Sequence, residues 1–156
     1  MTVDLVLYQP DIAQNTGTLL RLGACLGVRV HIVHPTGFVF SHQQLKRSGL
    51  DYLDRAEIVE HDSYDRFDRW RRDAARRLVL LTTKASQSAY TFTYLEGDML
   101  MLGRESGGVP EAVAAAADAT IRIPMRPGLR SINVAVAGAM IVGEALRQTN
   151  AFASLT

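Results

Sequence analysis

Three short segments of the chain combine glycines with polar side chains in a way that could build a ligand site. The first is Gln14-Asn15-Thr16-Gly17, and Arg21 follows it on a predicted helix. Asn15 can accept hydrogen bonds from the free amides at a helix start, and this capping role is its simplest explanation. Ligands bind near the carboxyl ends of strands in parallel sheets, so Arg21 is also a candidate binding residue.

The second segment is Gly103-Arg104-Glu105-Ser106-Gly107-Gly108, which lies between a predicted strand and a predicted helix. Glycines at such a junction let a ligand approach the backbone and bind to free amides. The spacing is not the dinucleotide fingerprint, and no Lys-Ser/Thr follows as in the Walker loop. Nor is it the nucleophile elbow, because Arg104 stands where the first glycine is required. A plain tight turn with Glu105 as a capping residue is the alternative.

The third segment is Ile123-Pro124-Met125, followed by Arg126, Arg130 and then Ser131-Ile132-Asn133. It leads into a predicted helix with a face rich in Ala and Gly, a pattern that favours close packing against another helix or subunit. Ser131 as a helix cap and the two arginines as exposed surface charges are the simplest alternative to a functional role.

Short apolar runs alternate with helical patterns along the chain. Strands are predicted over residues 3–8, 28–33, 78–83, 99–103 and 120–125. Helices are predicted over residues 15–26, 65–77, 110–117 and about 131–149. Several strands are apolar at nearly every position, as a sheet covered on both faces requires. The alternation therefore predicts an α/β fold with a parallel sheet.

The chain has 156 residues, of which 47% are hydrophobic and 21% charged, the size of one compact domain. No linker or repeat divides it, so we expect a single domain over residues 1–156 without an accessory RNA-binding domain. No apolar run approaches the ~20 residues that span a bilayer. The N-terminus lacks the features of a signal peptide, which favours the cytoplasm. The lone Cys25 excludes an intramolecular disulfide and a cysteine-based metal site.

The order and spacing of the three segments say more than any one of them. N-x-G-x-x-x-R follows the first strand, G-x-E-S-x-G follows a later one, and I-P-M…S-x-N-x-A-x-A lies near the C-terminus. This combination resembles the SPOUT (SpoU–TrmD) RNA methyltransferases, and most of all their minimal branch, which methylates the 2′-OH of the wobble cytidine or uridine of tRNA. The resemblance covers nearly the whole chain, including LYQPDIAQNTG, HPTGF, LKRSGLDY and LTTK.

The resemblance implies a deep C-terminal trefoil knot, a homodimer, and S-adenosylmethionine as methyl donor with no metal. It implies that the cofactor cleft is formed by residues of four segments: Leu81, Thr82, Gly103, Glu105, Gly108, Ile123, Met125 and Ser131. It also implies catalytic roles for Arg21, Ser131 and Asn133. Because a guanidinium has a pKa above about 12, we expect Arg21 to stabilise the developing alkoxide or orient a phosphate rather than act as a base.

The charge of the chain constrains how RNA is bound. The 17 Lys and Arg nearly balance the 16 Asp and Glu, which predicts weak long-range attraction. Eight of the acids lie in residues 51–80, where alternating charges predict a solvated, salt-bridged helix face. RNA contacts are instead expected from Asn15, Arg21, Arg126 and Arg130 in the first and third segments, and from Lys46 and Arg47 in the stretch LKRSGLDY.

The sequence departs from these relatives at a few positions and leaves other functions open. Relatives usually carry Pro in place of Arg104, a basic residue in place of Gly107, and, in the wobble branch, Tyr in place of Gly143. One alternative is therefore a SPOUT enzyme for another tRNA or rRNA nucleotide, and a second is a non-catalytic RNA-binding module. A third is a small-molecule enzyme that uses the glycine loop and takes its base from among four histidines: His31, His34, His42 and His61.

Overall fold

The computed structural model describes residues 2–47 and 53–156, without the side chains of His42, Lys46 and Arg47. This part of the chain forms one six-stranded sheet in the order β3-β2-β1-β5-β4-β6, and every pair of neighbours is parallel. The strands are β1 Asp4–Tyr8, β2 Val30–Val33, β3 Ile58–His61, β4 Leu78–Leu81, β5 Met99–Leu102 and β6 Ala119–Ile121. The predicted parallel α/β sheet is thus confirmed.

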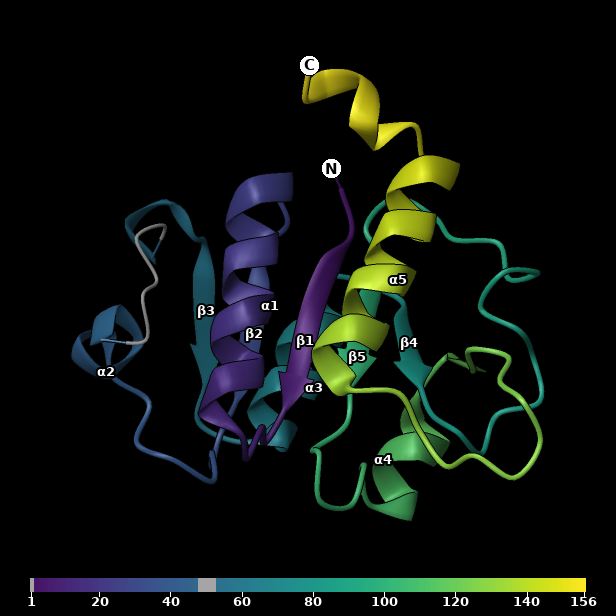
Figure 1. Cartoon of the computed structure of the whole chain (residues 1–156), viewed down its shortest axis with the longest axis horizontal. Coiled ribbons are helices and arrows are strands. Elements are labelled where there is room, and N and C mark those ends of the chain that lie inside the picture. Colours follow the sequence, from purple (N-terminus) through teal and green to yellow (C-terminus); the bar gives the residue numbers. More distant parts are fainter. Residues whose placement is uncertain (1, 48–52) are drawn as a thin grey trace.

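Helices cover both faces of the sheet (Figure 1). They are α1 Ala13–Leu26, α2 His42–Arg47, α3 Tyr64–Asp73, α4 Glu111–Ala116 and α5 Val134–Gln148. Figure 1 shows α1 and α5 on the near face, with α3 and α4 behind. Short 3₁₀ turns form at Leu53–Arg55 and Ala151–Ser154. None of the helices described is long and apolar enough to cross a lipid bilayer.

The side chains of β1 show how one strand serves two cores. Leu5 and Leu7 pack into the core beneath α1 and α5, whereas Val6 and Tyr8 pack into the core beneath α3 and α4. All five residues of β1 are buried. This double burial explains why the strand is apolar at nearly every position, because both faces must leave water.

The small residues of α5 allow it to approach the sheet and α1 closely. A Cβ at Gly138 would lie 2.8 Å from side-chain atoms of both Leu19 and Leu102. The interpretation of the Ala- and Gly-rich face as a packing face is therefore confirmed on this side of the helix. α1 in turn ends at Gly27, whose φ of 68° is a left-handed conformation that glycine adopts without strain.

The charged stretch over residues 51–80 departs from the prediction of a solvated helix face. Its ion pairs are present, but the edge strand β3 lies within it and α3 ends at Asp73. Arg71 and Arg76 are only 3% and 9% exposed. The alternating charges resemble an exposed helix because each buried arginine is matched by an acid. For Arg71 one such acid is Asp118, which is distant in sequence.

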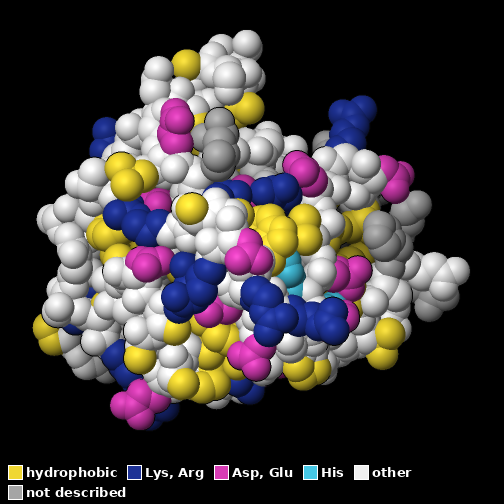
Figure 2. Space-filling model, turned by 180° about the vertical axis from the view of Figure 1, so that it is seen from behind, with side chains coloured by type: hydrophobic (Ala, Val, Ile, Leu, Met, Phe, Trp, Pro, Cys, Tyr) yellow, Lys and Arg dark blue, Asp and Glu magenta, His cyan; other side chains and the backbone are white. Residues whose placement is uncertain are grey.

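Titratable side chains on the α3 side of the sheet form a set that we call the rear cluster. Its members are Asp4, Arg29, His31, His61, Asp68, Arg71, Arg76 and Asp118. In the view from behind, basic and acidic side chains lie side by side with few large areas of one charge (Figure 2).

The predicted helices over 15–26, 110–117 and 131–149 form with shifted ends, whereas α2 and β3 were not predicted.

Candidate functional site

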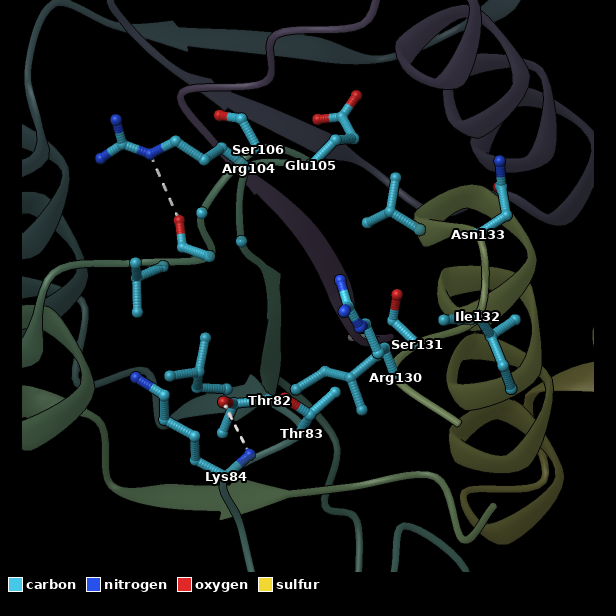
Figure 3. A pocket seen from close by; sticks show the side chains of 18 of the residues that line it. Thr82, Thr83, Lys84, Arg104, Glu105, Ser106, Arg130, Ser131, Ile132 and Asn133 are labelled. Carbon is cyan, nitrogen blue, oxygen red and sulfur yellow. Dashed lines mark hydrogen bonds between the residues drawn. The ribbon is translucent and has the colours of Figure 1, made fainter. Parts of the chain in front are cut away.

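A pocket of about 820 Å³ opens beside the carboxyl ends of β4 and β5. Its wall is built from four stretches of chain, residues 80–84, 103–109, 123–125 and 130–134 (Figure 3). The volume falls within the range of about 300–1,000 Å³ that is typical of small-molecule sites. The position at the strand ends is where parallel sheets bind ligands.

The structure gathers the predicted cofactor residues at this pocket. All eight of them line it: Leu81, Thr82, Gly103, Glu105, Gly108, Ile123, Met125 and Ser131. Asn15, Arg130 and Asn133 line it as well. Residues from all three segments that the sequence singled out therefore lie around one cavity.

Glu105 fastens the loop after β5 to the start of α1. Its carboxylate accepts hydrogen bonds from the backbone amides of Ile12 at 2.9 Å and Asp11 at 3.3 Å, and from Asn15 Nδ2 at 3.3 Å. The Asp11 carboxylate accepts in return from the Glu105 amide at 3.2 Å and from the Ser106 hydroxyl. We call these reciprocal bonds the Glu105–Asp11 latch.

The latch replaces a local helix cap. Ile12 is the N-cap residue of α1 and has no side-chain acceptor, so a carboxylate distant in sequence serves the free amides there. Burial raises the pKa of the Asp11 carboxyl, but the hydrogen bonds that it accepts lower it more, and the net pKa lies below its ordinary value. The anionic form of Asp11 is therefore favoured within the latch.

Asn15 and Asn133 connect the latch to α5. Asn15 donates to Glu105, and Asn15 Oδ1 accepts from Asn133 Nδ2 at 3.2 Å. Asn133 Oδ1 also accepts from the amides of Ala135 at 2.8 Å and Val136 at 3.2 Å, so Asn133 is the cap of α5. The alternatives in which Asn15 caps its own helix and Ser131 caps the last one are wrong, because Ile12 and Asn133 hold those positions.

The glycine loop is held closed by its own backbone. The amide of Arg104 donates to the Gly108 carbonyl at 3.1 Å, and the Gly108 amide donates back to the Arg104 carbonyl at 2.9 Å. A Cβ at Gly103 would lie 2.7 Å from Gly108 Cα, so a side chain there would force the loop open. The tight turn with Glu105 as a cap, given as an alternative to a ligand loop, is present in a loop that also lines the pocket.

Three cationic side chains surround the pocket, namely Lys84, Arg104 and Arg130. Figure 3 shows Arg130 beside Ser131 on one side, with Arg104 and Lys84 on the other. Within the part of the chain that the structure describes, none of the three forms an ion pair with a carboxylate. They are therefore available to an anionic ligand.

Other predicted residues lie away from the pocket. Arg21 is exposed on α1 and Arg126 is exposed in the loop before α5, and neither belongs to the lining. The side chains of Lys46 and Arg47, both predicted to contact RNA, lie outside the described residues.

The three histidines whose side chains the structure describes do not supply a base at the pocket. His31 and His61 are buried in the rear cluster, and His34 lies 2.8 Å from Glu60 through Nε2. The His42 side chain is outside the described residues. A small-molecule enzyme with one of the three described histidines as its base is therefore disfavoured. No group of His, Cys, Asp or Glu in the described residues is arranged to hold a metal ion.

Sequence reasoning missed part of the lining. Lys84 directly follows the predicted strand over residues 78–83, two positions after the predicted cofactor residue Thr82. Ile12 and the residues of α4 that line the pocket, Glu111 and Ala114, carry no polar pattern that points to a site. Their place follows from packing, which the sequence does not reveal.

Comparison with known proteins identifies relatives along almost the whole chain. The model of the SpoU rRNA methylase family matches residues 2–143. A tRNA (cytidine(34)-2′-O)-methyltransferase of Ancylobacter novellus is 57% identical over 98% of this chain and 97% of that protein. The protein of the same name from Escherichia coli is 40% identical over 94% of this chain and 93% of its own length.

Solved structures agree with these relatives. A structure described as giving insights into the 2-OH methylation of C/U34 on tRNA has a TM-score of 0.88 and 40% identity, and covers 94% of this chain and 95% of its own. An AdoMet-bound rRNA methyltransferase from Sinorhizobium meliloti has a TM-score of 0.84 and 26% identity over 94% of this chain and 56% of its own. The predicted resemblance is thus confirmed, and the chain belongs to the SpoU rRNA methylase family.

Proposed function

We propose that this chain is a tRNA 2′-O-methyltransferase, which transfers a methyl group from S-adenosylmethionine to the ribose of the wobble nucleotide, cytidine or modified uridine. The observation that carries the proposal is the meeting of Glu105, Asn15 and Asn133 from three separate segments at one pocket. Relatives at 57% and 40% identity bear the name tRNA (cytidine(34)-2′-O)-methyltransferase.

The pocket suits S-adenosylmethionine in size and lining. Apolar side chains of Leu81, Ile123, Met125 and Ile132 offer a surface for the adenine, and the closed loop at residues 103–108 offers backbone groups. When bound, the cofactor supplies a methyl group already activated by the positive sulfur. Residues of all four wall segments would hold it: Leu81, Thr82, Gly103, Glu105, Gly108, Ile123, Met125 and Ser131.

The remaining steps fall to the side chains of this chain. Ser131 and Asn133 lie at the entrance to α5, where they would orient the ribose or the cofactor. Arg21 lies six residues beyond Asn15 on α1, or about 9 Å along the helix axis at about 1.5 Å per residue. RNA that crosses the exposed face of α1 would place its ribose between Arg21 and the pocket. There the guanidinium would stabilise the negative charge that develops on the 2′ oxygen.

Phosphate contacts come from basic side chains around this path. Arg130 lines the pocket, Arg126 is exposed a few residues earlier, and Lys46 and Arg47 lie on α2. Each matched phosphate contact steepens the salt dependence of binding by about one unit. Asn15 completes the set at the pocket wall.

The exposed face of α5, together with Ile12 at the start of α1, is proposed to pair with a second copy of the chain. Ile12 at the start of α1 and Val136 in α5 are 45% and 52% exposed, so both offer apolar surface to a partner. A Cβ at Gly143 would meet nothing within 4 Å, so this face of α5 can accept a neighbouring helix. A Val136→Lys change should convert a dimer to a monomer in light scattering, and an unchanged dimer would contradict this surface.

Contacts of the segment at 82–98 support the proposed trefoil knot. Arg122 exchanges backbone hydrogen bonds of 2.7 and 2.9 Å with residues 87–89. The side chain of Gln148 forms two bonds of 2.9 Å with the backbone of residues 92–94. The chain from Arg122 to Gln148 thus leaves the 82–98 segment and returns to it.

The continuous sheet fits a single domain over residues 1–156. We place the activity of the chain in the cytoplasm, together with its tRNA substrate.

Nucleoside mapping tests the proposed function. The purified chain is incubated with labelled S-adenosylmethionine and unmodified tRNA, and the RNA is digested to nucleosides. We expect label in a 2′-O-methylated cytidine or uridine from position 34, the position in the relatives' name. Label at another nucleotide would overturn the wobble assignment, and no label in any RNA would overturn the methyltransferase.

An Arg21→Lys variant tests the role of the guanidinium. Lysine retains a positive charge but loses the planar fork that can contact two oxygens at once. We expect a large loss of transfer rate with unchanged affinity for S-adenosylmethionine. A full transfer rate in this variant would remove Arg21 from the reaction.

A further inference from the structure

We propose that Arg104 binds an anionic oxygen of the substrates at the mouth of the pocket, with Tyr8 as the residue that positions it. The inference rests on the proposed function, since the anionic groups are a backbone phosphate of the RNA or the carboxylate of S-adenosylmethionine. The observation behind it is that the half-buried side chain of Arg104 is held by Tyr8 and Gly108 and has no carboxylate partner among the described residues.

The Arg104 side chain is fixed at two points. Its Cζ lies 5.2 Å from the centroid of the Tyr8 ring, within the range of a cation–π contact. Its Nε donates to the Gly108 carbonyl at 3.3 Å. Its backbone is held by the two hydrogen bonds that close the glycine loop. Ordering of this side chain is therefore largely complete before any ligand binds, which lowers the entropic cost of binding.

Tyr8 is a firm support for this contact. It is the last residue of β1, at the centre of the sheet, and it is 4% exposed. Its ring packs edge-on against Tyr64, with centroids 6.0 Å apart. The Tyr8 ring thus cannot easily turn away from Arg104.

The two outer nitrogens of Arg104 have no partner among the described residues. Several other arginines with buried or half-buried side chains are matched with acids. Arg71 pairs with Asp68 and Asp118, and Arg77 pairs with Asp98. Arg104 instead stands on the same side of the pocket as Lys84, which also has no carboxylate partner in the described chain (Figure 3).

The carboxylates at the pocket do not neutralise this pair of cations. Glu105 accepts three hydrogen bonds in the latch, and Glu111 lines the pocket without an ion pair to Arg104 or Lys84. A planar guanidinium with two unused nitrogens matches two oxygens of a phosphate or a carboxylate. Both anions belong to the reaction, and the experiment must distinguish them.

The test compares Arg104→Gln with Arg69→Gln as a matched control. Arg69 is exposed on α3, away from the pocket lining. Affinity for unmodified tRNA is measured by fluorescence anisotropy from low to moderate salt, and affinity for S-adenosylmethionine by calorimetry. If a phosphate is bound, Arg104→Gln should weaken tRNA binding about tenfold and reduce the salt slope by about one unit, with cofactor affinity unchanged. Arg69→Gln should change neither affinity.

A tenfold loss of cofactor affinity with an unchanged tRNA slope would instead assign Arg104 to the carboxylate. If neither affinity changes, the proposal is overturned. A chain that binds the cofactor but neither binds nor methylates tRNA would defeat the proposed function. The cofactor arm would then still decide whether Arg104 binds an anion.

A second pair of variants tests the positioning role of Tyr8. Tyr8→Leu removes the ring face and should reproduce most of the loss seen in Arg104→Gln. The conservative change Tyr8→Phe keeps the ring face and should rescue binding. Because Tyr8 is buried, thermal melting verifies that both variants are folded before affinity is measured. Equal affinities in the two Tyr8 variants would overturn the positioning role.

Discussion

The rear cluster and the pocket both contain arginines and carboxylates, but the charges are matched to one another in the rear cluster alone. There, three Asp carboxylates contact three Arg guanidinium groups, and half of these side chains are buried. At the pocket, the carboxylate of Glu105 serves backbone amides instead. Lys84, Arg104 and Arg130 are left without a carboxylate partner in the described chain.

The difference follows from the cost of removing charge from water. A buried ion must be paired and hydrogen-bonded, whereas a cation at an opening keeps its water until a ligand replaces it. The rear cluster is therefore assigned to stability and the pocket cations to binding. Variants in the rear cluster should therefore leave ligand binding unchanged, and variants of the pocket cations should leave stability unchanged.

The largest expected effect is a loss of stability when Asp4 of the rear cluster is replaced. Its carboxylate, 4% exposed, accepts from His31 at 2.8 Å and Arg29 at 2.9 Å, with Arg76 at 3.3 Å. Burial raises the pKa of Asp4, but the His31 hydrogen bond and the Arg76 charge outweigh it, so the net pKa is lowered. Asp4→Ala should lower the free energy of unfolding by about 3–5 kcal/mol, because it leaves the buried Arg76 without a carboxylate.

Chemical denaturation measures this loss, with Asp62→Ala as the control. The Asp62 side chain is 86% exposed and 4.0 Å from Arg66, so its removal should change stability by less than about 1 kcal/mol. Equal losses in the two variants would show that the rear cluster is not a structural unit.

The next effect is a dependence of stability on pH at His61. Burial and the nearby His31 lower the pKa of His61 to about 4, from an ordinary value of 6.5. As pH falls from about 6.5 to 4, His61 binds a proton in the unfolded chain but not in the folded chain, so the free energy of unfolding falls. The slope from this group is at most about 1.4 kcal/mol per pH unit.

A comparison of wild type with His61→Gln isolates this contribution. Glutamine can still donate to His31, which lies 2.9 Å away through Nδ1, but it does not titrate. Denaturation between pH 4.5 and 7.5 should give a flatter profile for the variant. Parallel profiles would rule out His61 as the source.

At the pocket, Glu105→Ala should reduce binding more than it reduces stability. The change leaves the amides of Asp11 and Ile12 without their acceptor and frees the loop after β5. We expect the affinity for S-adenosylmethionine to fall about tenfold, or ~1.4 kcal/mol, because a loosened loop must be ordered when the cofactor binds. Calorimetry gives the affinity, and a normal value with an intact melting curve would contradict the role of the latch.

The smallest effects separate the two functions of Asn133. Asn133→Ala removes the cap of α5 and should cost about 0.5–2 kcal/mol of stability. Asn133→Asp keeps the capping oxygen but loses the amide that donates to Asn15. It should therefore retain stability and lower the rate of methyl transfer. Equal transfer rates in Asn133→Asp and wild type would contradict a role of the Asn133–Asn15 hydrogen bond in methyl transfer.

The sequence predicted the local features of the fold and site better than the distant ones. Five of the six strands in the described chain and all three site segments were located, because apolar runs and glycine-polar motifs are local signals. β3 was missed because Ile58–His61 is a short edge strand within a charged stretch. The latch was missed because Glu105 and Asp11 are far apart in sequence, and only folding brings them together.

Burial of charge was also outside the reach of sequence patterns. Arg71 resembled an exposed helix residue, since its partner Asp118 lies 47 residues away. Arg21 shows the reverse. Its motif predicted a residue of the site, but it lies on the exposed face of α1, where a role depends on how RNA and a second copy approach.

The most direct test of the central claim changes one oxygen atom of the substrate. Two tRNA transcripts are compared as methyl acceptors, one unmodified and one with a 2′-deoxy nucleotide at position 34, the position in the relatives' name. We expect label from S-adenosylmethionine to enter the first transcript and not the second, while both bind with similar affinity. Undiminished methylation of the deoxy transcript would contradict 2′-O-methylation at position 34.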